Sequence, residues 1–288
     1  MPALMDPSPA LVTRHSSAAV RTAERARGSS FTGNPTPPAA PASRFATCLR
    51  RFATAGLRLV VTTPYNNWIF ARGIKRFPER HIDRAAHAEW ETAYLKFCGR
   101  ESLSHDRGSW RILAVDRDDH VVGAITGRFF CGEIVRDHVQ VLSLFDRAGP
   151  VFREHCELAV SEVVEACRET GRTPAEISHW AVAPVWHAAL IAVTLVRAMG
   201  ALAAAFDAPV AVMAADNRRG EVNRLMRLGS TPLGLSGHSC LPPFVHHESG
   251  AWLRLLVLDA AAFHARNGNT AAADLNLLRE QASIISAG

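Results

Sequence analysis

The residues best placed to do chemistry surround a break in the middle of the chain, at Ala183-Pro184. An apolar strand ends there, and a long apolar helix begins directly afterwards. Because proline has no N–H group and interrupts strand pairing, the break leaves backbone amides between Val182 and Val185 without strand partners. Free amides beside a helix start can bind an anion or polarise a carbonyl oxygen. We therefore expect the functional site at this strand end.

The break belongs to a unit of four alternating elements. From Glu176 to Gly234 the sequence predicts a short strand, an apolar helix over 185–208, a strand PVAVMAAD and a polar helix closed by Gly229. This order requires a parallel strand pair with a crossover helix packed on the sheet. Sheets of this kind bind ligands at the carboxyl ends of their strands.

Hydrophobic periodicity predicts the remaining elements. The segments LRLVVTT (57–63), RILAVDR, VVGAITGRFF and WLRLLVL (252–258) are typical of strands, and a turn joins the middle two. Residues 81–98 and 150–170 have the spacing of amphipathic helices. The helix over 185–208 approaches membrane length, but Arg197 near its middle favours a buried core helix. No transmembrane segment is predicted.

Composition divides the chain into three regions. Residues 1–45 are rich in Ala, Ser, Pro and Arg without apolar periodicity, which is typical of disorder. Residues 46–265 contain the predicted core, and 266–288 are predicted to be a tail with a weak helix near 270–284. The six cysteines show no paired spacing and no signal-peptide core is evident, so we expect a cytoplasmic protein.

The basic charge gathers near the N-terminus. The formal net charge is +5, but residues 1–80 hold twelve Lys or Arg against three acidic residues. A nucleic-acid-binding domain would carry its basic residues on the folded core, so the pattern argues against that class. The basic residues could attract an acidic protein partner, or simply form a solvated surface. They include Arg50, Arg51, Arg58, Arg72, Lys75, Arg76 and Arg80.

These motifs carry a family resemblance. WAVAP before a helix, a strand ending in Ala-Asp-Asn and a helix ending in Arg-Leu-Gly resemble the second half of the GNAT acyltransferase fold. EISHWAV and RLMRLGSTPLG look like the branch of long-chain N-acyl amino acid synthases and acyl-homoserine lactone synthases. The resemblance covers roughly residues 55–262. It implies an α/β (α+β) fold: a mixed, centrally split sheet flanked by helices, with an inserted helix at about 150–170.

Two departures from the acetyl-coenzyme A pattern of that superfamily bear on the acyl donor. Pro184-Val-Trp-His187 stands where a glycine-rich phosphate loop is usual, and Leu225 stands where many members carry a tyrosine acid. Without that loop, a coenzyme A pyrophosphate has fewer amide donors to bind. The resemblance therefore implies an N-acyltransferase that moves a fatty acyl group from acyl carrier protein (ACP), or from acyl-CoA, to a small amine such as an amino acid. An ACP would dock on Arg50, Arg51, Arg72, Lys75 and Arg76.

Two other functions stay open. The chain could be an acetyl-CoA-dependent N-acetyltransferase with a degenerate phosphate loop. It could also be a non-catalytic GNAT-fold module that binds an acyl ligand or a partner protein, since the arginine, glycines and tyrosine of active members are missing.

Acyl transfer to an amine needs a base, a donor that polarises the thioester carbonyl and an apolar slot. Glu133, just beyond a strand end, and His179 are the candidate bases. Glu133 could equally be a solvated loop residue, and His179 a core histidine. His179 stands where the synthase branch usually has an arginine, so that arginine's role is not carried over.

The remaining site predictions concern binding. Asn217 follows a strand end and could contact the donor or simply cap the next helix. The loop over 237–250 lacks the spacing of a zinc site, so no metal is predicted. The predicted donor contacts are Val182, Ala183, Val185, His187 and Asn217, and the predicted acyl or acceptor contacts are Trp180, Trp186, Phe130 and Phe244.

Overall fold

The described part of the chain is organised around one mixed sheet. The computed structural model describes residues 43–63, 81–99, 109–130, 139–145, 149–203, 205–206, 209–218, 220–235, 240–247, 249–267 and 270–286. All of them lie in the unit Pro41–Gly288. The strands are β1 (Arg58–Thr63), β2 (His81–Ile82), β3 (Trp110–Val115), β4 (Val121–Phe129), β5 (Pro174–Val182), β6 (Val210–Asp216), β7 (Thr231–Pro232), β8 (Phe244–Val245), β9 (Trp252–Asp259) and β10 (Ala282–Ser286).

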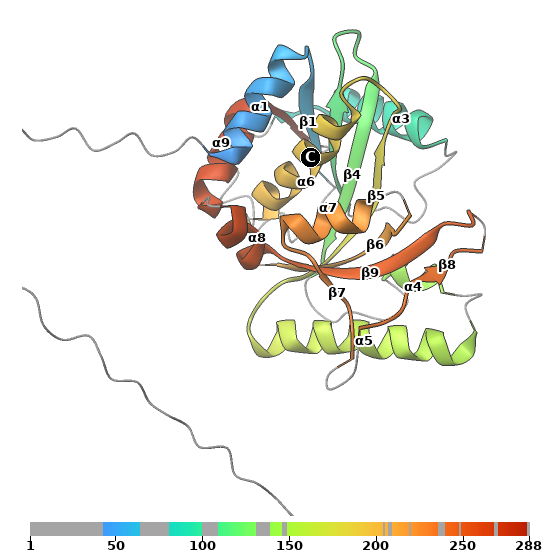
Figure 1. The fold of residues 1–288 in the computed structure, drawn as a ribbon. Coiled ribbons are helices and arrows are strands. Elements are labelled where there is room, and N and C mark those ends of the chain that lie inside the picture. Colours follow the sequence, from blue (N-terminus) through green and yellow to red (C-terminus); the bar gives the residue numbers. More distant parts are fainter. Residues whose placement is uncertain are drawn as a thin grey trace, which may run out of the picture. The chain divides into compact units, whose positions relative to one another are not determined.

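The described strands pair in the order β2-β10-β1-β3-β4-β5-β6-β9-β7, and β8 also pairs with β9 (Figure 1). The run β1-β3-β4-β5 is antiparallel, β5 and β6 are parallel, and β9 is antiparallel to β6. The sequence predicted the hairpin of β3 and β4 and the parallel pair of β5 and β6 within this arrangement.

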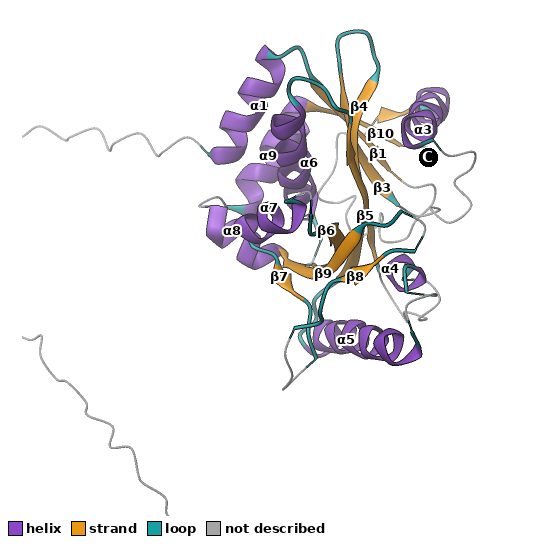
Figure 2. Cartoon of the chain, turned by 45° about the vertical axis from the view of Figure 1, so that its right-hand side comes forward, coloured by secondary structure: helices purple, strands orange, loops and turns teal. Residues whose placement is uncertain are grey.

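Helices lie on both faces of this sheet. They are α1 (Arg44–Thr54), α3 (Arg84–Cys98), α4 (Gln140–Ser143), α5 (Pro150–Glu169), α6 (Ala188–Ala203), α7 (Glu221–Leu228), α8 (Ala260–Asn267) and α9 (Ala271–Gln281). Figure 2 shows α1, α6, α7, α8 and α9 on one face, which we call the α6 face, and α3, α4 and α5 on the opposite face. Among the described residues, no helix is long and apolar enough to cross a membrane.

The sheet is split at its centre. β5 pairs with β6 only from Pro174 to Ile177, where Ile177 lies opposite Met213. Beyond that point β5 stays on β4 through Val182, while β6 stays on β9 through Asp216. The predicted architecture, a centrally split mixed sheet with flanking helices and a helix at about 150–170 (α5), is confirmed.

The helix α6 packs directly against β4 because two glycines leave room for it. A Cβ atom on Gly123 would lie 2.5 Å from Cγ2 of Ile191, and one on Gly127 would lie 2.9 Å from Sδ of Met199. Residues 194–203 of α6 are all buried, as expected for a core helix rather than a membrane span. The sheet and the helix thus share one apolar core on the α6 face.

The region predicted as a tail from 266 contains the end of α8, the predicted weak helix (α9) and the strand β10. β10 lies between β1 and β2 and runs parallel to both. A short strand with one buried isoleucine, Ile284, has too little periodicity to be found in the sequence. The helix α1 begins at Arg44, two residues before the predicted domain boundary at 46, and the Ser43 hydroxyl caps it.

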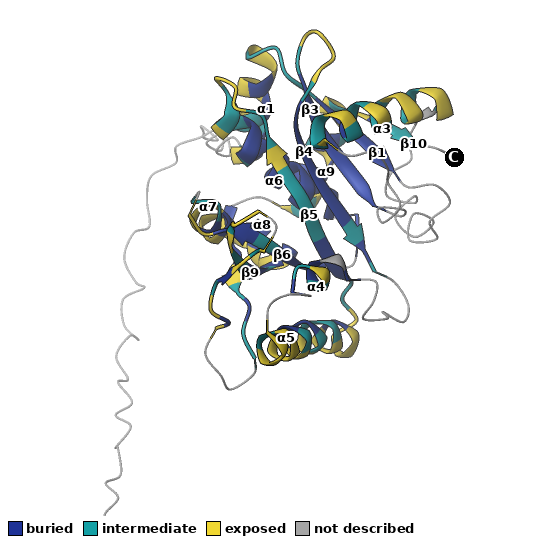
Figure 3. Ribbon diagram, turned by 90° about the vertical axis from the view of Figure 1, so that its right-hand side faces the viewer, coloured by how far each residue is buried: buried dark blue, intermediate teal, exposed yellow. Residues whose placement is uncertain are grey.

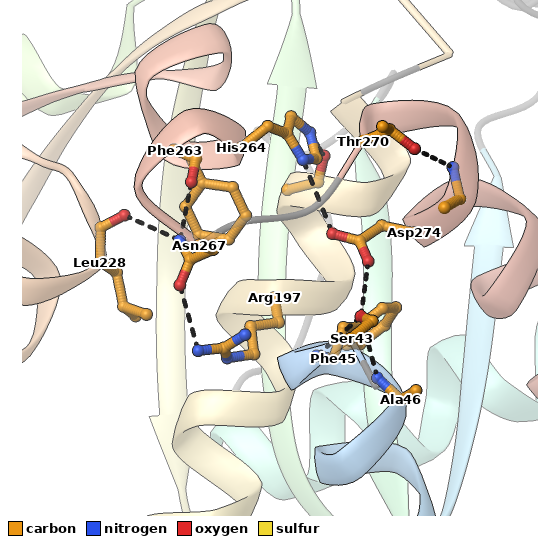
Figure 4. Close-up of polar contacts among 12 residues, drawn as sticks. Ser43, Phe45, Ala46, Arg197, Leu228, Phe263, His264, Asn267, Thr270 and Asp274 are labelled. Atoms are coloured by element: carbon orange, nitrogen blue, oxygen red, sulfur yellow. Dashed lines mark hydrogen bonds and ion pairs between the residues drawn. The ribbon is translucent and has the colours of Figure 1, made fainter. Parts of the chain in front are cut away.

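Buried polar contacts tie the C-terminal helices to α1 and α6 (Figure 4). The Ser43 hydroxyl donates to Asp274 at 3.2 Å, and Nδ1 of His264 lies 3.6 Å from the other Asp274 oxygen. Nε2 of His264 contacts the carbonyl oxygen of Gly200 at 3.1 Å. The last helices are therefore integral to the fold.

Asp259 links the loop before β5 to the start of α8. Its carboxylate accepts two hydrogen bonds of 2.7 Å from Arg172, and one oxygen also accepts the amides of Ala261 and Ala262. Burial by itself would raise the pKa of Asp259, but the hydrogen bonds and the charge of Arg172 outweigh it and hold the pKa below its ordinary value.

Asp259→Asn should therefore destabilise the protein at neutral pH and lose that effect in acid. A lowered folded-state pKa stabilises the fold above the unfolded value of about 3.9, and this contribution fades as the pH falls through the folded value. Urea unfolding between pH 7 and pH 3 measures the difference between wild type and variant, with Glu165→Gln as an exposed control. A difference that stays constant below pH 4 would contradict the assignment.

Gly123→Ala should lower the free energy of unfolding by about 1–3 kcal/mol, the usual cost of overpacking a filled core. In an Ile191→Ala background the same change should cost less, because the side chain that clashes is gone. Denaturant titration of the four proteins measures both costs. Equal costs in the two backgrounds would mean that Gly123 is required for a reason other than space.

Candidate functional site

The open edge of β5 carries a backbone donor that points into the split. The Ala183 amide donates to the Val122 carbonyl at 2.9 Å, so the neighbouring pair of Val182 and Gly123 is not hydrogen-bonded. The N–H of Val182 therefore faces away from β4, toward the side where β6 would have continued. The amides of Ala183 and Val185 are both used, the latter by the Ala183 carbonyl at 2.8 Å. Of the amides predicted between 182 and 185, Val182 is thus the one directed into the split.

A bulge distorts β5 just inside this edge. Thr126 and Ala124 of β4 lie opposite Ser178 and Ala181, so β5 holds one more residue than β4 in this stretch. His179 takes up the excess with φ +50°, a left-handed conformation that side chains rarely adopt. Such strain persists only where the surrounding structure enforces it, and it is often found at functional sites.

Polar side chains form a row across the opposite face of the sheet. The register places Thr62, Arg111, Thr126 and Ser178 side by side on β1, β3, β4 and β5. The first three are at most 3% exposed. Side chains directly opposite in a sheet lie close enough to interact, so the row is continuous. Buried polar groups in such number are unusual for a sheet face.

The next row adds a buried ion pair. Nη2 of Arg128 donates to Oε2 of Glu176 at 3.1 Å, and Glu176 is only 2% exposed. The other Glu176 oxygen accepts the Val141 amide at the start of α4. We call these two rows, Thr62, Arg111, Thr126, Ser178, Arg128 and Glu176, the polar belt. Figure 3 looks onto this face, where the middle of β4 and β5 runs between α3 and α4.

The helix α3 supplies partners at one end of the polar belt. Arg111 pairs with Glu91, and its guanidinium lies 4.9 Å from the centre of the Tyr94 ring. The Thr126 hydroxyl donates to the Tyr94 hydroxyl at 3.2 Å. These contacts fix the side chains of the polar belt in one arrangement and compensate for the side-chain entropy that is lost.

The α6 face beside the split is apolar. A pocket of about 20 Å³ lies between Gly127 and Ile177 of the sheet and Met199, Gly200 and Phe263 of the helices. This volume holds about one water-sized group. Ile177 is also the last β5 residue paired with β6, so the pocket adjoins the closed end of the split.

The structure separates the predicted aromatic contacts. Phe130 and Phe244 belong to the cluster under α5, Trp180 packs on the α6-face core, and Trp186 is 95% exposed. Of the predicted donor contacts, His187 and Val185 lie in the turn before α6, and the backbone N–H of Asn217 donates to the carbonyl oxygen of Trp252 at 2.6 Å.

The predicted base and docking residues are only partly described. Glu133 lies outside the described residues, as do Arg72, Lys75 and Arg76. Arg50 and Arg51 are exposed on α1. Asp116, Asp118 and His120 are the described group whose ligand atoms lie within 4.8 Å of one another, but Asp116 already accepts the two other residues' amides in a tight hairpin turn.

The sequence analysis missed Arg128 and Glu176, although a signal for them exists. Both interrupt strands whose other residues are mostly apolar, and their positions lie directly opposite each other across β4 and β5. A charged residue inside a buried strand has to be paired. Two opposite charges at facing positions would have identified the pair once the register between β4 and β5 was known.

Neither a family model nor a curated protein sequence matches the chain. Several solved structures do. TofI is 14% identical, with 75% of this chain and 98% of that chain covered and a TM-score of 0.42. FeeM, an N-acyl amino acid synthase from uncultured soil microbes, is 13% identical over 73% and 95% of the two chains, with a TM-score of 0.37. BjaI, a CoA-dependent acyl-homoserine lactone synthase, is 19% identical over 77% and 100%, also with a TM-score of 0.37. At these identities the likeness concerns the fold, and the chemistry follows from the chain's own residues.

Arg128→Met should destabilise the protein by about 3–5 kcal/mol, because it leaves the Glu176 carboxylate buried without its guanidinium. The double variant Arg128→Met/Glu176→Met should cost less than the sum of the single changes. Urea unfolding of the four proteins measures this coupling. Additive costs would show that the two side chains do not act as a pair.

Proposed function

We propose that this chain is an N-acyltransferase, which moves an acyl group from a thioester to the amine of a small acceptor. The split between β5 and β6 carries the proposal. It combines an open strand edge, the Val182 amide directed into the gap and a strained bulge at His179. A thioester arm that enters beside Val182 would run along this edge toward the bulge.

The reaction needs few groups. The acceptor nitrogen attacks the thioester carbonyl carbon, the C–S bond breaks, and the thiol leaves with a proton. A backbone amide near the bulge, at Trp180, would stabilise the negative oxygen of the tetrahedral intermediate. The Val182 amide, two residues closer to the entrance, would hold the arm. The acyl chain would lie against the apolar α6 face of the sheet beside Ile177.

For the catalytic base we keep the two residues predicted from the sequence, His179 and Glu133. His179 lies at the bulge itself, and imidazole titrates near neutral pH, as a base for an amine requires. Glu133 remains the second candidate.

We favour ACP as the carrier, with acyl-CoA as the alternative. Pro184 to His187 offers no glycine loop for a pyrophosphate, and exposed arginines are available for an acidic partner on α1 (Arg50, Arg51) and on α7 (Arg224, Arg227). The described cysteines are free thiols, in keeping with a cytoplasmic enzyme. The alternatives are an acetyl-CoA-dependent N-acetyltransferase with a degenerate phosphate loop and a non-catalytic binding module.

Expression of the chain in a heterologous bacterium, followed by untargeted mass spectrometry of the lipid extract, tests the class. New N-acylated amino acids, absent from cells with the empty vector, would support the proposal and identify acceptor and chain length. A blank extract, together with no release of carrier thiol in vitro, would discard it in favour of acetyl transfer or a binding module.

Replacing single amides by esters should separate the two backbone roles. An ester at Trp180 should lower kcat by about 10²–10³-fold, the usual effect of losing an oxyanion donor. An ester at Val182 should mainly raise the donor KM. The matched control is Ala181, whose position pairs with Ala124 of β4. Equal kinetic effects at all three positions would contradict the assignment.

His179→Ala and Glu133→Gln should each slow acylation by about two orders of magnitude if the residue supplies the base. The loss should be smaller at high pH, where more of the acceptor amine is already neutral. Rates of thiol release across pH 6–10 measure both effects. Unchanged rates for both variants would remove them from the mechanism.

A further inference from the structure

The turn before α6 exposes a tryptophan ring to solvent. Trp186 is 95% exposed, and its neighbours Pro184 and Val185 are exposed as well. Between Ile177 and Val196 the sequence contains no Asp, Glu, Lys or Arg. An exposed indole is costly in water, because its burial would remove a large apolar surface. An apolar surface of this kind marks a place where a protein contacts something apolar.

A second tryptophan is exposed on the other side of the split. Trp252, at the start of β9, is 37% exposed, and Val245, which pairs with it from β8, is 54% exposed. The guanidinium carbon of Arg218 lies 5.2 Å from the centre of the Trp252 ring. The backbone N–H of Asn217, just after β6, donates to the Trp252 carbonyl oxygen, so Trp252 lies where β6 ends. Trp186 follows the end of β5, so each side of the open end of the split carries an exposed tryptophan.

The helices on the two faces of the sheet carry opposite net charge (Figure 2). Those on the α6 face contain eight arginines and three acidic residues, a formal charge of +5. The described helices on the opposite face contain four Lys or Arg and seven acidic residues, a formal charge of −3. Two of the three acidic residues on the α6 face are engaged internally, because Asp274 is buried and Glu221 accepts the Asp216 amide. The α6 face therefore presents a positive surface, which complements a negatively charged one.

The packing of α1 on α6 places two of these arginines toward Trp186. The start of α1 is linked to the end of α6 through Asp274 and His264 (Figure 4). The two helices pack against each other, so they run antiparallel and the last turns of α1 lie toward the start of α6. Arg50 and Arg51 are exposed in these last turns, and two further exposed arginines lie on α7.

We propose that the α6 face docks on an anionic lipid bilayer, with Trp186 inserted at the level of the lipid headgroups. Tryptophan favours this interface, because its ring is apolar while its N–H group can still reach water. The surrounding arginines keep their guanidinium groups among the lipid phosphates while their alkyl stems contact apolar atoms. This inference goes beyond acyl transfer and does not depend on it.

A bilayer fits these features better than an acidic protein does. An acidic protein is recognised by charge pairs at defined positions, and the turn around Trp186 has no charged side chain to offer. A bilayer requires only apolar side chains that enter the headgroup layer and cations around them, without defined pairing. The exposed arginines of the α6 face are distributed in this way, over α1, α7 and α8.

Vesicle flotation of the full chain tests the proposal. The vesicles contain phosphatidylcholine alone, or phosphatidylcholine with about one third of anionic phosphatidylglycerol. We expect the partition coefficient to be about tenfold or more higher on the anionic vesicles, and to fall at high salt. Trp186→Ala should lower it by about tenfold, because the inserted ring is lost. Val151→Ala, which shortens an exposed apolar side chain on α5, should leave it unchanged.

Two matched double variants test the charge. Arg50→Gln/Arg51→Gln should weaken binding to anionic vesicles by about tenfold or more, because two arginines near the lipid surface are lost. Arg153→Gln/Arg168→Gln, which removes the same charge from α5 on the opposite face, should bind like the wild type. Every variant keeps residues 1–42, so the arginines of that segment contribute equally to each measurement.

The outcomes separate this inference from the proposed function. Equal binding of wild type and folded Trp186→Ala, or equal losses in the two double variants, would overturn the docking surface. Binding to ACP that depends on Trp186, without binding to vesicles, would overturn it as well and assign this face to a protein partner. Acyl transfer by a chain that does not bind vesicles would reject the docking surface alone, whereas vesicle binding that depends on Trp186 would sustain it even without acyl transfer. Circular dichroism of the variants establishes that they are folded.

Discussion

Two parallel strands that separate after four residue pairs are the constraint on which the rest of the structure depends. A strand edge that loses its neighbour must find another partner or be left for a ligand. β6 is paired along its whole length with β9, and β5 remains on β4. Each strand therefore keeps one edge that faces the split. Where β5 and β6 no longer pair, side-chain packing has to stabilise the sheet. The helix α6 provides this packing on one face, where it contacts the glycines of β4.

Beside the split, the sheet is apolar on one face and carries charged side chains on the other. On the α6 face, Gly123, Gly127 and Gly200 allow close packing, and a small apolar pocket adjoins Gly127 and Gly200. On the opposite face, Arg128 and Glu176 bring charge into the sheet. In the proposed reaction, an amine acceptor and an apolar acyl chain would need opposite environments near one carbonyl carbon. A sheet only one residue thick can provide both, because alternate side chains point to opposite faces.

The parts of the fold that follow from local patterns could be predicted from the sequence. The apolar run of α6, the amphipathic spacing of α5 and the strand before Pro184 each carry their signal within one segment. β10 could not be predicted, because ASIIS has too few residues to show a hydrophobic period. It becomes a strand through its pairing with β1 and β2. The pair of Arg128 and Glu176 depends on the register between β4 and β5, and the φ of His179 depends on a one-residue excess in the same register. A site that depends on the register between two strands cannot be predicted from either segment alone.

The position of β10 has a consequence for how the protein is made. Residues 282–286 fill a place between β1 and β2, so β1 keeps one edge unpaired while more than two hundred residues are translated after it. Domains generally fold as units during synthesis, and unpaired strand edges in incomplete chains promote aggregation. The edge of β1 therefore stays exposed on the nascent chain until β10 has left the ribosome. A chain truncated before residue 282 would keep this exposed strand edge, which chaperones and proteases can recognise.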